Sequence, residues 1–123
     1  MINKSSYWVA PIVGNNDATL LPTEVSIRYL KSVTADLIPF PEGLTLIAGD
    51  GAGTTSSDTD TAYFQCGNSN TRYGSIPQDC RDDVDIVVLF QDCWDGEEVN
   101  WFAAKGGKGT HMTYSSGGSC PSR

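Results

Sequence analysis

The stretch from Val84 to Gly96, VDIVVLFQDCWDG, decides the expected fold. Apolar side chains occupy both alternating faces of residues 84–90, and this pattern is typical of a central strand covered by a layer on each side. Asp95-Gly96 is a tight-turn signal directly after that strand. We therefore expect a sheet protein whose innermost strand ends in a corner that carries two carboxylates, a tryptophan and a cysteine.

Shorter strand patterns lie on both sides of this stretch, separated by clusters of Gly, Pro, Asn, Asp and Ser. They occur at residues 7–13, 25–29, 44–48, 62–66 and 111–114. No ten-residue stretch carries a helical stripe, and residues 97–104 have room for one or two helical turns at most. The pattern predicts an all-β fold, an antiparallel β-sandwich or jelly-roll-like arrangement with little helix.

Length and charge limit the function classes. The 123 residues predict a single domain, 1–123, with residues 115–123 as a tail tethered by Cys120. A net charge of −7 with only eight basic residues argues against a nucleic-acid partner. No apolar run reaches the roughly 18 to 20 residues of a membrane span.

Four cysteines, Cys66, Cys80, Cys93 and Cys120, are separated by 13, 12 and 26 residues. A zinc site of four thiolates normally uses close pairs, so two disulfides in an oxidising compartment are favoured, together with a secreted, extracellular location. Three pairings are possible. Cys66–Cys80 with Cys93–Cys120 is preferred, because each pair closes a loop that is poor in apolar residues.

The corner after the central strand has two interpretations. In the structural one, Asp95-Gly96 forms the turn, Trp94 caps the core and Cys93 is disulfide-bonded. In the functional one, Trp94 packs on the apolar C–H face of a sugar while Asp92 or Asp95 accepts hydrogen bonds from its hydroxyls. Asp50 and His111 complete the candidate ligand-binding set.

His111 is the only histidine, and its ordinary role is that of a hydrogen-bonding residue. Beside Asp95 it is a candidate general base, so His111 and Asp95 are the candidate catalytic residues. With the cysteines in disulfides, one histidine is too few for a transition-metal site, and we expect no metal of that kind.

Two acidic clusters are candidate calcium ligands. Asp58 and Asp60 lie in one polar loop, and a second cluster surrounds Cys80, comprising Asp79, Asp82, Asp83 and Asp85. Neither has the spacing of an EF-hand loop, and solvated turn carboxylates are the default interpretation. No resident cofactor is expected beyond this calcium alternative.

Several motifs occur in a characteristic order: Ser6-Tyr7-Trp8-Val9-Ala10-Pro11, Pro39-Phe40-Pro41-Glu42-Gly43-Leu44, Ile47-Ala48-Gly49-Asp50, the block from Phe90 to Gly96, His111-Met112-Thr113-Tyr114, and Gly118-Ser119-Cys120-Pro121. Together they resemble the DUF1996 family, an uncharacterised secreted domain often found beside WSC or other carbohydrate-binding modules. The resemblance spans nearly the whole chain and implies a secreted, disulfide-bonded, β-rich protein.

The chain departs from that family at both ends. Family members carry a histidine-rich segment before the part matching Tyr7-Trp8 and further strands after the part matching Cys120-Pro121. They also carry an extra histidine shortly before His111, where this chain has residues 105–110 (KGGKGT). If the family has a histidine-based site, this chain retains only one of its histidines, His111. That loss weakens the case for catalysis.

Three functions are compatible with these observations. The first is a non-catalytic module that binds a glycan or cell-wall polymer. The second is a structural or assembly subunit that binds copies of itself at an extracellular or particle surface. The third is a polysaccharide hydrolase or lyase that uses His111 and Asp95. The residues favour a protein that is not an enzyme.

Overall fold

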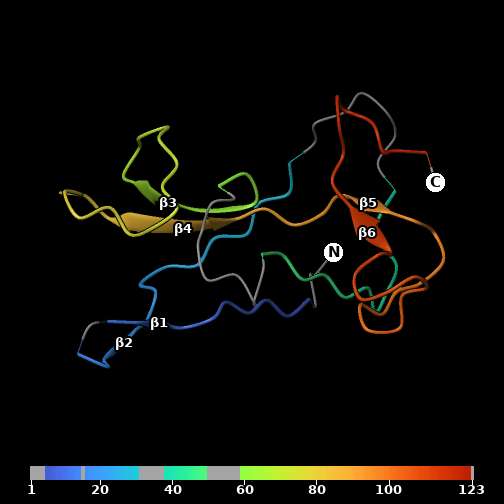
Figure 1. Ribbon diagram of the computed structural model, residues 1–123, viewed down its shortest axis with the longest axis horizontal. Helices are drawn as coiled ribbons and strands as arrows, with labels where there is room; N and C mark the ends of the chain where they lie inside the picture. Colours follow the sequence, from blue (N-terminus) through green and yellow to red (C-terminus); the bar gives the residue numbers. More distant parts are fainter. Residues whose placement is uncertain (1–4, 15, 31–37, 50–58, 123) are drawn as a thin grey trace. The chain divides into compact units, whose positions relative to one another are not determined.

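The computed structural model describes residues 5–14, 16–30, 38–49 and 59–122. Within these ranges there is no helix, and six short strands pair into three two-stranded antiparallel sheets (Figure 1). The fold is all-β, as the short apolar runs and turn clusters predict. The sandwich or jelly-roll arrangement of the sheets stays a prediction. None of the described residues forms a helix that could cross a membrane.

The chain divides into two compact units, residues 1–31 and 32–123. In the first unit β1 (Ile12–Val13) pairs with β2 (Thr19–Leu20), and the Asp17 N–H closes the turn by donating to the Gly14 carbonyl at 3.0 Å. None of the side chains described in this unit is buried. That the two units form one domain stays a prediction.

The second unit contains β3 (Ala62–Cys66) and β4 (Val84–Val88), which pair antiparallel along their full length. The expectation that residues 84–90 are buried on both faces is wrong, because the side chains of Val84 and Ile86 are 38% and 43% exposed. Apolar side chains on both faces of a strand make burial on both faces favourable. They do not show that the rest of the chain supplies a layer to cover each face. In the described residues, β3 is the one strand that pairs with β4.

The remaining strands are β5 (Cys93–Trp94) and β6 (Met112–Thr113). The core lies here: the four buried residues among those described are Cys93, Ala104, His111 and Met112. A disulfide from Cys93 to Cys120, with a Cα–Cα distance of 5.5 Å, holds the C-terminal segment against this sheet. The second disulfide joins Cys66 to Cys80. Both bonds have the pairing that loop closure favoured.

Two expected strands are absent and three are shortened, among them residues 84–90, which form only Val84–Val88, and residues 111–114, which form only Met112–Thr113. Residues 25–29 form no strand and are exposed, and only Ile12–Val13 of residues 7–13 is a strand. Residues 44–48 are not a ladder strand either, although hydrogen bonds to Val99 and Gln91 hold them in place. An extended segment becomes a strand only when it exchanges backbone hydrogen bonds with another segment. The alternation of apolar and polar residues within the segment does not identify that partner.

Candidate functional site

Four of the five predicted ligand residues lie on the short ladder between β5 and β6. Beyond the paired strands, the Asp92 N–H donates to the Thr113 carbonyl at 3.2 Å and the Asp95 N–H donates to the His111 carbonyl at 3.0 Å. Asp95 therefore lies opposite His111 across the ladder, while Trp94 lies opposite Met112. Asp50, the fifth predicted residue, lies outside the described residues.

The His111 side chain is completely buried, with 0% of its surface exposed. Its Nε2 lies 2.9 Å from the carbonyl oxygen of Thr45, and because a carbonyl oxygen only accepts, Nε2 is the donor. Nδ1 is buried and has no hydrogen-bond partner. In this conformation the imidazole ties residues 44–48 to β6 and presents no surface to a ligand in solvent.

Trp101 covers the histidine from the adjoining loop. The two rings meet edge to face, with centroids 5.8 Å apart and planes at 79°. The indole also lies directly over Gly109, where a Cβ would come within 2.3 Å of the ring. The Gly109 N–H donates to the Trp101 carbonyl at 2.9 Å, so backbone and side chain together close the loop between them.

The Trp94 side chain is half-buried, and its indole N–H donates to the Glu98 carbonyl at 2.7 Å. One carboxylate oxygen of Asp95 accepts the backbone N–H groups of Glu97 (2.9 Å) and Glu98 (3.3 Å). Gly96, at φ 84°, occupies the turn between them. These contacts agree with the structural interpretation, in which Asp95-Gly96 forms a turn. The Asp95 carboxylate takes the place of a backbone carbonyl as the acceptor in that turn.

Asp92 is exposed but makes two contacts through its carboxylate. Its two oxygens accept the backbone N–H and the hydroxyl of Ser115, at 2.7 and 2.6 Å. Ser115 begins the tail that Cys120 ties to Cys93. Asp92 therefore positions the start of this C-terminal segment.

Residues 44–48 are the part of this region that sequence reasoning did not connect with the candidate site. The Thr45 backbone N–H donates to the Val99 carbonyl at 2.8 Å, and the Thr45 hydroxyl accepts the backbone N–H of Trp101 at 2.6 Å. The Gln91 side-chain amide donates to the Ile47 carbonyl at 3.0 Å. Thr45 is 66 residues from His111, so no local pattern signals their contact; the adjacent aromatics Trp101 and Phe102 were the available signal for the loop.

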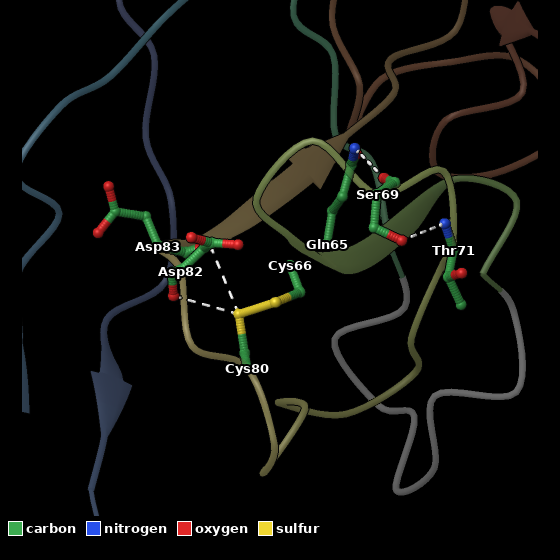
Figure 2. The surroundings of a disulfide bond; sticks show 7 residues. All are labelled: Gln65, Cys66, Ser69, Thr71, Cys80, Asp82 and Asp83. Carbon is green, nitrogen blue, oxygen red and sulfur yellow. Dashed lines mark hydrogen bonds between the residues drawn. A yellow bond between two sulfur atoms is a disulfide. The ribbon is translucent and has the colours of Figure 1, made fainter.

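The second candidate region surrounds the Cys66–Cys80 disulfide (Figure 2). The Cys80 sulfur lies 3.1 Å from the Asp82 carbonyl oxygen; a disulfide sulfur carries no proton, so this is a close contact rather than a donated hydrogen bond. An open, polar hollow of about 350 Å³ is lined by Gly67, Asn68, Asp82, Asp83 and Asp85.

The structure gives the calcium alternative no support in the parts of the chain that it describes. Among those residues, no group of three or more His, Cys, Asp or Glu side chains is arranged to hold a metal ion. Calcium needs about six to eight oxygen ligands, and acidic residues that only share a hollow do not supply them. Asp58 of the other acidic cluster lies outside the described residues.

Comparison with known proteins gives a family but no activity. No curated protein and no solved structure matches this chain. One family model does, described as "Domain of unknown function (DUF1996)", and it matches residues 2–123. The chain, with its two disulfides and its short antiparallel strands, therefore belongs to the DUF1996 family.

Proposed function

We propose that this domain is an extracellular, non-catalytic module that binds a glycan or cell-wall polymer. The observation that carries the proposal is an aromatic side chain on an ordered support: the Phe102 ring is 69% exposed, next to a Trp101 that is packed against Gly109 and His111. The two disulfides support an oxidising compartment outside the cell.

An exposed ring suits a sugar because one face of a pyranose presents C–H groups that pack on an aromatic surface. Association costs less when the binding loop is already ordered. The loop at residues 101–110 meets that condition, since the single hydroxyl proton of Thr110 is shared between the carbonyls of Lys105 (2.9 Å) and Gly107 (3.0 Å). The partly exposed Trp94 is the second aromatic contact that we propose.

The hydrolase or lyase alternative is the less favoured one. A general base must reach the substrate, whereas His111 is buried and bonded to Thr45. The carboxylates of Asp92 and Asp95 accept backbone N–H groups, which favours a supporting role for both. We therefore assign these three residues to the scaffold beneath the binding surface.

Binding of the native, disulfide-bonded protein to a panel of insoluble and soluble polysaccharides tests the proposal. We expect Phe102→Ala to weaken binding by about 10-fold, the upper range for loss of one aromatic contact. Trp8→Ala is the matched control, because Trp8 is 87% exposed but lies in the other unit. No binding by the wild type would overturn the proposal, and loss of binding in Trp8→Ala alone would move the site to residues 1–31.

A second candidate, an assembly subunit, is favoured by a different observation. In the first unit the side chains of Trp8, Leu21 and Leu30 are 87%, 79% and 81% exposed. A contiguous patch of exposed apolar side chains marks an interaction surface, and we propose that these residues contribute to one. Sedimentation over a range of protein concentrations would reveal self-association, and Leu21→Asp with Leu30→Asp should reduce it. A strict monomer at high concentration would remove this candidate.

A further inference from the structure

Charge is segregated along the last 45 residues of the chain. Residues 79–98 contain eight Asp and Glu and a single Arg. Residues 99–123 contain no Asp or Glu, but they contain Lys105, Lys108 and Arg123. In a protein with a net charge of −7, the loop at residues 101–110 is therefore locally cationic. We call it the basic loop.

The two lysines of the basic loop are exposed and are not neutralised by carboxylates of the described residues. The one ion pair among those residues joins Arg72 to Asp60 at 3.9 Å, away from the basic loop in sequence. The Lys108 ammonium instead lies over the ring of Phe102, 5.8 Å from its centroid. A cation at that distance is attracted to the face of the ring. This attraction keeps the Lys108 ammonium next to the Phe102 ring.

The backbone of the basic loop is closed by internal hydrogen bonds. The Gly107 N–H donates to the Ala104 carbonyl at 3.0 Å, and Thr110 bonds the carbonyls of Lys105 and Gly107. Gly106 and Gly107 have φ values of 98° and 133°, which other residues rarely adopt. Glycines therefore allow a tight loop that carries two exposed lysines, one of which, Lys108, lies over the exposed Phe102 ring.

We propose that the ligand of the basic loop is an acidic polysaccharide, with carboxylates that pair with Lys105 and Lys108 while Phe102 packs on a sugar face. This inference rests on the proposed glycan-binding function and names the class of glycan. A uronic-acid residue offers both features that the loop matches, an apolar C–H face and a negative charge on the same ring.

Polygalacturonate and its fully methyl-esterified form provide the test, because they share a backbone and differ in carboxylate charge. We expect the native protein to bind polygalacturonate about 10-fold more tightly than the ester, with the difference shrinking as NaCl is raised from about 20 to 300 mM. Lys105→Gln with Lys108→Gln should remove about the same 10-fold on the acidic polymer and leave the ester unaffected. Both lysines are exposed, so neither substitution threatens folding.

Arg81→Gln is the charge-matched control, since it removes an exposed cation that lies outside the basic loop. It should change binding by less than about 2-fold. Equal binding of the acid and ester forms, or equal loss in the Arg81 variant, would overturn this inference while leaving glycan binding intact. Binding to neither polymer nor to any other glycan would overturn both proposals. Preferential binding to anionic vesicles or DNA over polygalacturonate would assign the loop to a different ligand.

Discussion

Gly109 shows how one residue supports the buried histidine. At φ 75° it has a backbone conformation that costs a residue with a side chain about 1–2 kcal/mol. The Trp101 ring occupies the space where a Cβ would lie, at 2.3 Å. The ring cannot move aside without losing its edge contact with His111.

We therefore expect Gly109→Ala to destabilise the fold by about 2–4 kcal/mol, the sum of backbone strain and overpacking. Chemical denaturation followed by tryptophan fluorescence measures the loss. Gly96→Ala is the matched control, because Gly96 has a φ of 84° but no atom lies within 4 Å of the place that a Cβ would take. It should cost about 1–2 kcal/mol, from strain alone. Equal losses in the two variants would show that Trp101 does not constrain position 109.

Trp94 and Asp95 illustrate a different situation at the same scale. Their motif predicted a tight turn, which is present, and a tryptophan that caps the core. The Trp94 side chain is half-buried and its indole N–H donates to the Glu98 carbonyl. The same residues predicted a ligand site, which stays a prediction. Residue types disclose which hydrogen bonds a side chain can make, but not whether a turn or a ligand uses them.

At the scale of the elements, the two disulfides connect strands to the segments around them. Cys66–Cys80 closes the β3–β4 region with a sequence separation of 14, and Cys93–Cys120 attaches the tail to β5 with a separation of 27. Loop-closure entropy alone assigns them about 3 and 3.5 kcal/mol, respectively. They differ more in their surroundings, because Cys93 is only 3% exposed and belongs to the core.

Replacing Cys93 and Cys120 by Ala should consequently cost more than replacing Cys66 and Cys80. We expect a difference of about 1–2 kcal/mol in the free energy of unfolding, from the cavity left at Cys93 added to the longer loop. Urea denaturation of each double variant under non-reducing conditions provides the comparison. The opposite ranking would mean that the β3–β4 sheet, and not the β5–β6 sheet, contains the stability-determining core.

At the scale of the whole molecule, negative charge dominates. The 15 acidic residues outnumber the eight basic ones, and the described residues contain a single ion pair. Repulsion among like charges destabilises a folded chain, and salt screens that repulsion.

Raising NaCl from about 20 to 300 mM should accordingly raise the thermal midpoint by about 1–3 °C. Scanning calorimetry at constant pH measures this shift. Asp82→Asn with Asp83→Asn, which removes two neighbouring charges beside Cys80, should raise the midpoint at low salt and reduce the salt increment. A midpoint that falls with salt would show that attractive pairs outweigh the repulsion.

The sequence by itself determined the class of fold, the two disulfides and the family. Turn residues, short apolar runs and cysteine spacing act over a few residues or through loop closure, so they are visible along the chain. It did not determine how much of each strand is covered, and β4 is more exposed than its alternation suggests.

Only the tertiary structure decided where the predicted site residues lie. The burial of His111 depends on a carbonyl 66 residues away and on an indole held over Gly109. Such contacts form when segments far apart in the sequence meet. The sequence of one segment does not identify the segment that it will contact. Burial is a property of the assembled chain, which is why the sequence could name His111 as a candidate base but could not show that its side chain is buried. Its role as a base stays a prediction.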